Sequence, residues 1–555
     1  MKNKKLLAIA IALTMCFVLI AACTPADTPA GPGPGPGPAT TPGTAGGGGD
    51  QAGALAEAPP EDEDVVFARS LDVIVDNNNI AVINPFNPAA NPTSTNWIFT
   101  MVHDRLMERD DATGDFIPSL AASWETDDFQ TFVFHLQEGV TFHNGNPFTA
   151  DDVVFTVEHA RAVGAGSPGA AQWLPVRTAT AIDDYTVELV LQDPFVDFFH
   201  NLSVASASVV SRAAVEANAD TGTHIGTGPF EVAEFVSNDF VRMTRNPNFW
   251  NTDRLNIVTE EITLRFVPEM SARTIRMQNG ESQLSFGTSA DDLPLFQANP
   301  NFQVIPQTFN TIQGFSFNMS DPLLQDLNLR RAIMHATNRE EIALFAASEW
   351  AVSIYGHPNG GGTIWGYASD FRNNNIPAIP FDPDLARQYL EASNYNGEEI
   401  EIAAAIITNI RAAQALQQQL AVVGINTRIA EFDSPGLSAY MINPDSGSQI
   451  VFFSLQMNYS ASSIANSFYP GGSQNRMQFN NPEVSALITQ AAAEFDPVVR
   501  EQIYFRIQEI VAEDPPFLQV FWRINGTVAA DGLGGIRLPA DNLQNDFRQI
   551  FKVVD

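Results

Sequence analysis

The chain has 555 residues, of which 45% are hydrophobic and 17% charged, and its formal net charge is −35 at pH 7. This length exceeds what one hydrophobic core supports, so we expect two or three domains. The charge excludes nucleic acid as an expected partner, because phosphate contacts need clustered Lys and Arg. Acidity of this size predicts a soluble, self-repelling surface but identifies no ligand.

The N-terminus has the pattern of a secretory signal: three lysines within residues 2–5 precede the apolar run Leu6–Ala22. The alternative, a membrane-spanning helix, usually needs about 20 apolar residues. The run ends at Ile20-Ala21-Ala22-Cys23, which resembles the bacterial lipobox, so we predict a lipoprotein signal peptide over 1–23 and acylation of Cys23. Cleavage there also removes Cys16, so no intramolecular disulfide is expected.

Residues 24–64 consist mainly of Pro, Gly, Ala and Thr, with acidic residues at the end. Such a segment has almost nothing to bury and is predicted to be disordered. Forty flexible residues have a mean span of about 35 Å. We therefore expect a tether that holds a folded domain away from a membrane surface.

The folded part is predicted to start near Val65. A strand is expected at Ser70–Val75, and a helix at Thr95–Leu106. Phe132 and Phe134 alternate as in a half-buried strand. Thr149 is a suitable N-cap for a helix whose first turn contains Asp151 and Asp152.

Residues 313–342 change pattern twice. Phe315 and Phe317 flank Ser316 as in a half-buried strand, and a helical core face follows at Leu329, Ala332, Ile333 and Ala336. Asn338 is then placed to cap a second helix, with acidic residues in its first turn. An ordinary strand and helix of an α/β domain accounts for this pattern without any functional role.

The following region alternates helix and strand. Asp382-Pro383 predicts a helix start, Glu399–Ile407 a strand, Arg411–Val423 a helix that ends at Gly424, and Ile425–Phe432 a second strand. This order predicts a βαβ unit of a mostly parallel sheet. Near the end, Asp496-Pro497 predicts another helix start, and Phe517–Trp522 a return strand.

No nucleophile elbow, Walker lysine loop or HExxH pair is present in the sequence, and the eight histidines lack metal-ligand spacing. Gly164–Gly169 fits GxGxxG, but it follows a predicted helix and contains Pro168, so we interpret it as a loop from which no helix opens. We therefore predict a protein that is not an enzyme and uses no cofactor and no metal.

Several ordered blocks resemble family 5 of the extracellular solute-binding proteins, the oligopeptide, dipeptide and nickel receptors of ABC importers. The blocks are LAASWE at 120–125, GVTFHNG at 139–145 with TADDVVF at 149–155, GTGPF at 226–230, RNPNFW at 245–250, and NLRRAIMHATNREEI at 328–342. Together they span most of the chain after residue 65.

The resemblance implies an α/β, two-lobed periplasmic-binding-protein-like fold, of class II and the large three-subdomain form, with a hinge between the lobes. Lobe one would comprise 65–313 plus 518–555, with an inserted subdomain at about 107–221, and lobe two 314–517. The chain would cross between lobes, and bend on ligand binding, at Gln313–Asn318 and Leu518–Trp522.

The implied function is capture of a ligand outside the cytoplasm and its delivery to ABC importer permease subunits. We expect a monomer anchored to the bacterial cell membrane through Cys23. Two alternatives stay open, a surface lipoprotein that senses ligand without transport and an extracellular hydrolase, although the latter lacks recognisable catalytic residues.

Oligopeptide is the expected ligand. In peptide-binding members, a W-x-A-D-Y motif supplies an aspartate to the peptide ammonium, but the matching stretch here is Leu455-Gln456-Met457-Asn458-Tyr459. The neutral amide of Asn458 favours an alternative ligand, an oligosaccharide. The expected ligand-binding residues are Asn91, Thr93, Gln313, Phe315, Trp365, Tyr367, Gln456, Asn458 and Tyr459.

Overall fold

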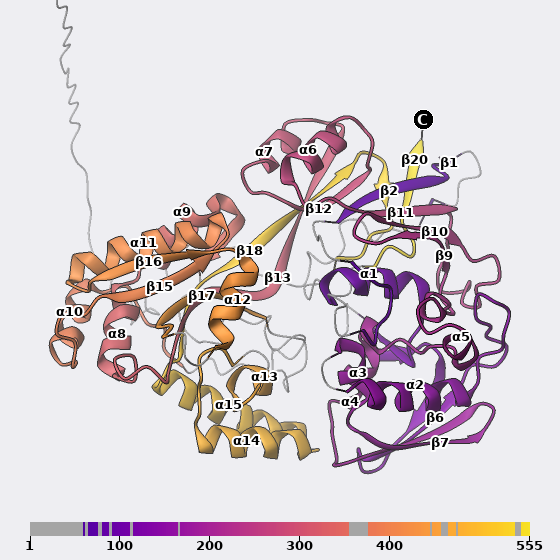
Figure 1. Ribbon diagram of the computed structural model, residues 1–555, viewed down its shortest axis with the longest axis horizontal. Helices are drawn as coiled ribbons and strands as arrows, with labels where there is room; N and C mark the ends of the chain where they lie inside the picture. Colours follow the sequence, from indigo (N-terminus) through magenta and orange to yellow (C-terminus); the bar gives the residue numbers. More distant parts are fainter. Residues whose placement is uncertain are drawn as a thin grey trace, which may run out of the picture. The chain divides into compact units, whose positions relative to one another are not determined.

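We describe a computed structural model of the full chain (Figure 1). The structure describes residues 59–60, 65–75, 80–87, 92–110, 115–164, 167–353, 376–443, 447–456, 464–472, 475–538 and 546–554. The predicted signal peptide with Cys23, and nearly all of the predicted tether, lie outside these residues. No helix within these ranges is long and apolar enough to cross a membrane.

The largest sheet among the described residues has 11 strands, in the order β16-β15-β17-β13-β18-β12-β2-β11-β10-β9, with β14 added on β18. Its strands are β2 (Ser70–Val75), β9 (Phe230–Val236), β10 (Phe240–Arg245), β11 (Glu261–Phe266), β12 (Leu284–Thr288), β13 (Phe302–Phe317), β14 (Ala351–Ser353), β15 (Ile400–Ala405), β16 (Thr427–Phe432), β17 (Ile450–Gln456) and β18 (Phe517–Ala530).

Three smaller sheets accompany it. They are β5-β6-β8-β7, the pair β3-β4, and β1-β20-β19. Their strands are β1 (Val66–Phe67), β3 (Met107–Arg109), β4 (Phe116–Pro118), β5 (Ala121–Glu125), β6 (Thr131–Leu136), β7 (Val176–Asp183), β8 (Thr186–Leu191), β19 (Leu533–Gly534) and β20 (Phe551–Val554).

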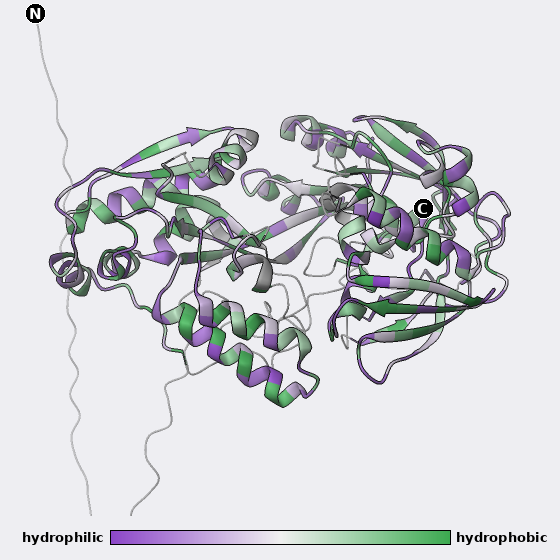
Figure 2. Ribbon diagram, turned by 60° about the horizontal axis from the view of Figure 1, so that its bottom comes forward, coloured by the Kyte–Doolittle hydropathy of each residue, from purple (hydrophilic) through white to green (hydrophobic). Residues whose placement is uncertain are grey.

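The helices carry both hydrophobic and hydrophilic residues (Figure 2), as expected for elements that cover a core on one side. They are α1 (Pro92–Val102), α2 (Ala150–Val163), α3 (Pro168–Trp173), α4 (Phe198–Ser203), α5 (Arg212–Ala217), α6 (Met270–Gln278), α7 (Leu293–Gln297), α8 (Leu327–Ala336), α9 (Arg339–Ala347), α10 (Pro383–Glu391), α11 (Ile407–Val423), α12 (Ser434–Ile442), α13 (Ile464–Phe468), α14 (Pro482–Ala493) and α15 (Pro497–Glu513).

The strand β2 has the predicted bounds, although the unpredicted strand β1 precedes it, and the first helix lies about three residues earlier than expected. The helix α1 ends at Val102 because the carbonyl of Val102 accepts a hydrogen bond from the amide of Gly228, at 2.9 Å. A Cβ atom on Gly228 would lie 2.6 Å from the carbonyl carbon of Val102, so glycine is required for this approach. A contact across more than a hundred residues therefore determines where the helix ends.

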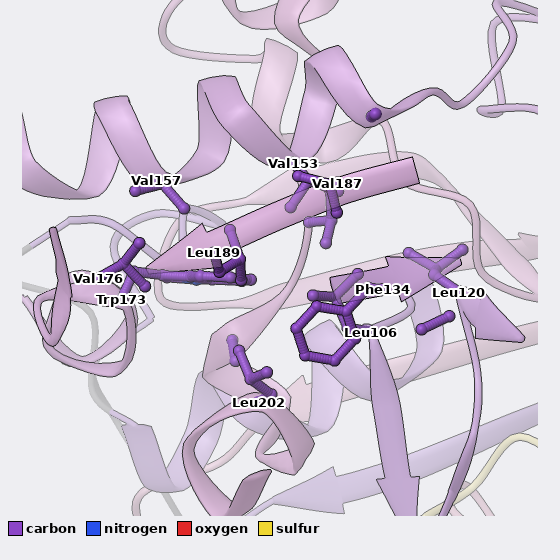
Figure 3. Packing of buried hydrophobic residues seen from close by; sticks show 14 of the residues in the cluster. Leu106, Leu120, Phe134, Val153, Val157, Trp173, Val176, Val187, Leu189 and Leu202 are labelled. Carbon is purple, nitrogen blue, oxygen red and sulfur yellow. The ribbon is translucent and has the colours of Figure 1, made fainter. Parts of the chain in front are cut away.

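The sheet β5-β6-β8-β7 has a hydrophobic core of its own. Phe132 and Phe134 of β6 are fully buried, as the alternation predicted, and Figure 3 shows Val153 and Val157 of α2 facing strand residues such as Leu189. The helix α2 begins after Thr149, whose backbone amide donates to the Asp152 carboxylate at 3.1 Å. This packing covers one face of the sheet with the helix that the sequence predicted.

The interpretation of 164–169 as a loop without a following helix was wrong. The short helix α3 begins at Pro168, and the Ser167 hydroxyl accepts a hydrogen bond from the amide of Ala170, at 3.3 Å. Proline suits this position because the first helical residue has no intrahelical partner for its amide. The segment still shows no strand before the glycines, so it is not a dinucleotide-binding turn.

The strand–helix–helix order of 313–342 is confirmed. Asn338 caps α9 by accepting a hydrogen bond from the amide of Glu341, at 3.2 Å, and the four predicted core positions of α8 are buried. The prediction of a half-buried strand was wrong, however. Ser316 is also buried and donates to the carbonyl of Val451, because β13 is covered on both faces.

The second half contains the predicted βαβ unit, in which β15 and β16 pair in parallel around α11. The helix α11 begins at Ile407, four residues before the expected start, because Ile406 adopts a left-handed φ of 56° and ends the strand. A β-branched residue rarely adopts this conformation. The prediction of a mostly parallel sheet was wrong, because the sheet is mixed: β13 pairs antiparallel with both β17 and β18, and β10 with both β9 and β11.

Candidate functional site

The long strands β13 and β18 connect two parts of the main sheet. Near Phe302 and Ala530 the pair adjoins β12, whereas from Thr311 to Phe317 strand β13 pairs with β17. The predicted crossing segments, Gln313–Asn318 and Leu518–Trp522, both lie on this pair. The candidate site is therefore the part of β13, β17 and β18 around Gln313.

Gln313 occupies a defined position between the two neighbouring strands. It lies opposite Ser454 of β17 and Phe521 of β18, and the Ser454 hydroxyl donates to the Gln313 side-chain oxygen at 2.8 Å. Only 6% of Gln313 is exposed. Its side chain is thus held in place by hydrogen bonding and packing.

The pairing of β13 with β18 is irregular beside Gln313. Gln313 pairs with Phe521 and Gly314 pairs with Gln519, so Val520 is an extra residue on β18. Such a bulge turns the following side chains toward the other face of a sheet. Gly314 is needed here, because a Cβ atom would lie 2.3 Å from the carbonyl oxygen of Leu518.

Gln519 is the residue of this site that the sequence analysis missed. It is 2% exposed, and neither its side-chain oxygen nor its nitrogen has a hydrogen-bond partner within the described part of the chain. Its backbone carbonyl accepts from the Arg339 guanidinium at 2.8 Å. In the sequence, Gln519 is the one amide side chain within the apolar run Phe517–Trp522. An amide in such a run is expected to be buried, and buried amides normally have hydrogen-bond partners.

The structure describes few of the other predicted ligand-binding residues. Phe315 is fully buried and packs edge-on against Phe452, with ring centroids 4.9 Å apart, so packing accounts for it and its ligand contact stays a prediction. Thr93 lies in the first turn of α1, and Gln456 ends β17 opposite Thr311. Asn91, Trp365, Tyr367, Asn458 and Tyr459 lie outside the described residues.

Leu455, at the position of the motif's tryptophan, is fully buried beside Ile312 in the core of helices α13–α15. The structure therefore brings together Gln313, Ser454 and the strand that leads into 456–459. Thr93 is on a helix whose residues Trp97 and Met101 pack in another core cluster. No group of three potential metal-ligating side chains occurs in the parts of the chain that the structure describes.

The glycine-rich block at 226–230 has a structural role. The Trp250 indole and the Thr227 hydroxyl both donate to the Asp104 carboxylate, at 2.8 and 2.9 Å. Burial raises the pKa of Asp104, and the hydrogen bond from Trp250 partly opposes this effect. The His143 ring accepts from the amide of Gly226 at 3.2 Å, so two of the resembling blocks contact each other.

The fold and the crossing pair of strands define a class of binding protein. The model of the bacterial extracellular solute-binding proteins, family 5 Middle, matches residues 115–477, and the chain belongs to this family. Its members are extracytoplasmic receptors rather than enzymes.

Named relatives agree with this membership. A Brucella ovis protein with the provisional name ABC transporter peptide-binding protein is 28% identical over 443 residues, covering 76% of this chain and 81% of the relative. Heme-binding protein A of Haemophilus influenzae is 25% identical over 482 residues, covering 78% and 84%.

Among solved structures, the dipeptide binding protein from Pseudoalteromonas sp. SM9913 in complex with Met-Leu gives a TM-score of 0.72. It is 22% identical, and the match covers 87% of this chain and 100% of that protein. The predicted family, the α/β periplasmic-binding-protein fold and the role as a substrate-binding receptor are thus confirmed.

Proposed function

We propose that this receptor captures an oligopeptide and delivers it to the permease subunits of an ABC importer. The observation that carries the proposal is the similarity, over about three quarters of the chain, to a relative named for peptide binding and ABC transport. Gln313 and Gln519 both lie beside the irregular pairing of β13 with β18. The unpartnered amide of Gln519 offers both a donor and an acceptor nearby.

A screen of ligand classes tests the proposal. Purified protein is heated with a library of di- to pentapeptides and, separately, with a library of oligosaccharides. A ligand that binds only the folded state at 100 times its Kd adds about 2.7 kcal/mol of stability, which a thermal-shift assay detects readily. Stabilisation by peptides is expected, and stabilisation by saccharides alone would refute the peptide assignment.

Oligosaccharide is the second candidate, because Asn458 replaces the acid that peptide-binding members present to the ligand ammonium. A hydrogen bond to a charged group contributes about 1.5–3 kcal/mol, against about 1 kcal/mol for a neutral pair. If peptides bind, Asn458→Asp should therefore tighten binding about 2- to 30-fold, measured by calorimetry. Peptides with an acetylated N-terminus have no ammonium group and are the control. The variant should bind them no more tightly than the parent protein does. Weaker binding of free peptides by the variant would show that Asn458 does not occupy the ammonium position.

A lipid on Cys23 would hold the receptor at the membrane. The support is the lipobox-like Ile20–Cys23 and the Pro- and Gly-rich segment at 24–64. Cys23→Ala should leave the precursor unprocessed or release the protein from the membrane fraction, and Cys16→Ala is the matched control. Unchanged membrane attachment and processing in Cys23→Ala would contradict this anchor.

Ligand binding would close two lobes, one formed by 65–313 plus 518–555 with an inserted subdomain at about 107–221, and the other by 314–517. The irregular pairing at Gln313–Gly314 and Val520 supports a bend in the two crossing segments. Small-angle scattering of the monomer should show a smaller radius of gyration with a tight ligand. Identical scattering curves would argue against closure. A receptor that only senses ligand would bind and close in the same way but would not restore uptake in a strain lacking it.

A further inference from the structure

A cluster of buried charges connects the segment after α1 to the C-terminal segment. Arg548 donates to both oxygens of Glu108, at 2.6 and 3.1 Å, and also to Asp546, at 2.7 Å. Glu108 and Arg548 are 440 positions apart in the chain and are 3% exposed each. The cluster therefore attaches the C-terminal segment to the β3 strand.

Arg105 is the member of this cluster that lacks adequate partners. Its Nη2 atom lies 3.6 Å from Glu108, whereas its Nε and Nη1 atoms are buried and have no hydrogen-bond partner in the described ranges. Glu108 already accepts from Arg548 and, at 2.7 Å, from Arg254. Arg105 is only 5% exposed, and its burial lowers the pKa of the guanidinium, so an unmatched charge here is costly.

A small cavity of about 20 Å³ is lined in part by Arg105. The residues that line it are four arginines, two acids and one threonine: Arg105, Arg109, Arg537, Arg548, Glu108, Asp546 and Thr100. The lining thus has an excess of two positive charges, although the whole chain has a net charge of −35. A space of this size holds about one water-sized particle.

We propose that this cavity binds one small monovalent anion of the halide class, with chloride as the natural occupant and Arg105 as its principal ligand. A halide accepts from the Nε and Nη1 donors and supplies the negative charge that the shared carboxylates leave missing. Sulfate or phosphate is larger and doubly charged, and it would lie against Glu108 and Asp546. The anion completes the connection between the C-terminal segment and the residues that precede the β3 strand.

The test compares melting temperatures in sodium chloride and in sodium gluconate at equal ionic strength. With 0.2 M chloride the parent protein should melt about 1 to 2 °C higher than in gluconate, by mass action on the folded state. Arg105→Met should lose this difference. Arg254→Met is the matched control, because it also removes a partner of Glu108 but does not line the cavity, so it should keep the chloride response.

A second measurement does not depend on the stability of a variant. Crystals of the parent protein grown in sodium bromide should show an anomalous scattering peak beside the Arg105 guanidinium. Ordered water there, without an anomalous peak, would overturn the proposal. Equal melting in chloride and gluconate would also overturn it, as would a sulfate response that Arg105→Met abolishes.

Discussion

His103, in the turn that follows α1, should make the folded protein sensitive to mild acid. It is 2% exposed, and its Nε2 atom lies 2.9 Å from the carbonyl oxygen of Thr223. A carbonyl only accepts, so Nε2 carries the proton of the neutral ring, and Nδ1 is buried without a partner among the described residues. Burial, with a smaller contribution from His143, lowers the pKa of His103 to about 3.

The sign and size of the effect follow from linkage. The unfolded chain binds a proton at His103 near pH 6.5, whereas the folded protein resists protonation until about pH 3. The stabilising contribution is therefore complete above pH 6.5 and is lost as the pH falls from 6.5 toward 3. Between pH 7.5 and pH 5, His103 should lower the free energy of unfolding by about 2 kcal/mol.

Denaturant unfolding at pH 7.5, 6 and 5 tests this in the parent protein and in His103→Gln. The glutamine amide can still donate to Thr223, but it does not titrate. The variant should be less stable at pH 7.5, and its deficit should shrink by about 2 kcal/mol at pH 5. Val102→Ala, a buried neighbour on α1, is the control and should lower stability equally at every pH. A deficit of His103→Gln that stays constant from pH 7.5 to 5 would refute the reasoning.

Three further substitutions test local structure by denaturant unfolding. Asp382→Ala removes the cap that accepts from two amides of α10 and should cost about 1 kcal/mol, and no change would contradict that cap. Leu420→Ala leaves a cavity in a buried core and should cost about 2–5 kcal/mol, whereas the exposed Val422→Ala should change stability by less than about 0.5 kcal/mol. Gly535→Ala should lower the free energy of unfolding clearly more than Gly447→Ala, although both glycines have positive φ. The reason is that a Cβ atom at position 535 would lie 1.9 Å from the carbonyl oxygen of Gln549, whereas a Cβ atom at position 447 has no such contact. Equal losses of stability in the two glycine variants would contradict this prediction, because they would show that the chain moves to relieve the close contact.

Local signals in the sequence predicted much of the secondary structure. The N-caps at Thr149, Asn338, Asp382 and Asp496 each lie where a helix begins, and Gly424 ends α11 in the left-handed conformation. These features depend on the side chain and backbone of a few consecutive residues, which is why the sequence specifies them. The resembling blocks also identified the family, because their order and spacing are specific.

Only the tertiary structure decided features that depend on distant segments. The end of α1 is set by Gly228, the burial of Ser316 by the cover on both faces of β13, and the irregular pairing of β13 with β18 by the extra residue Val520. The shared carboxylate of Glu108 needs Arg548 from the other end of the chain. Hydrophobic periodicity indicates which side chains of a helix or strand face the core and which face solvent. It does not indicate which distant residue supplies a hydrogen-bond or charge partner. The sequence therefore identified the family. It did not show that the amide of Gln519 lacks a hydrogen-bond partner or that the charge of Arg105 is unmatched, because both depend on distant segments.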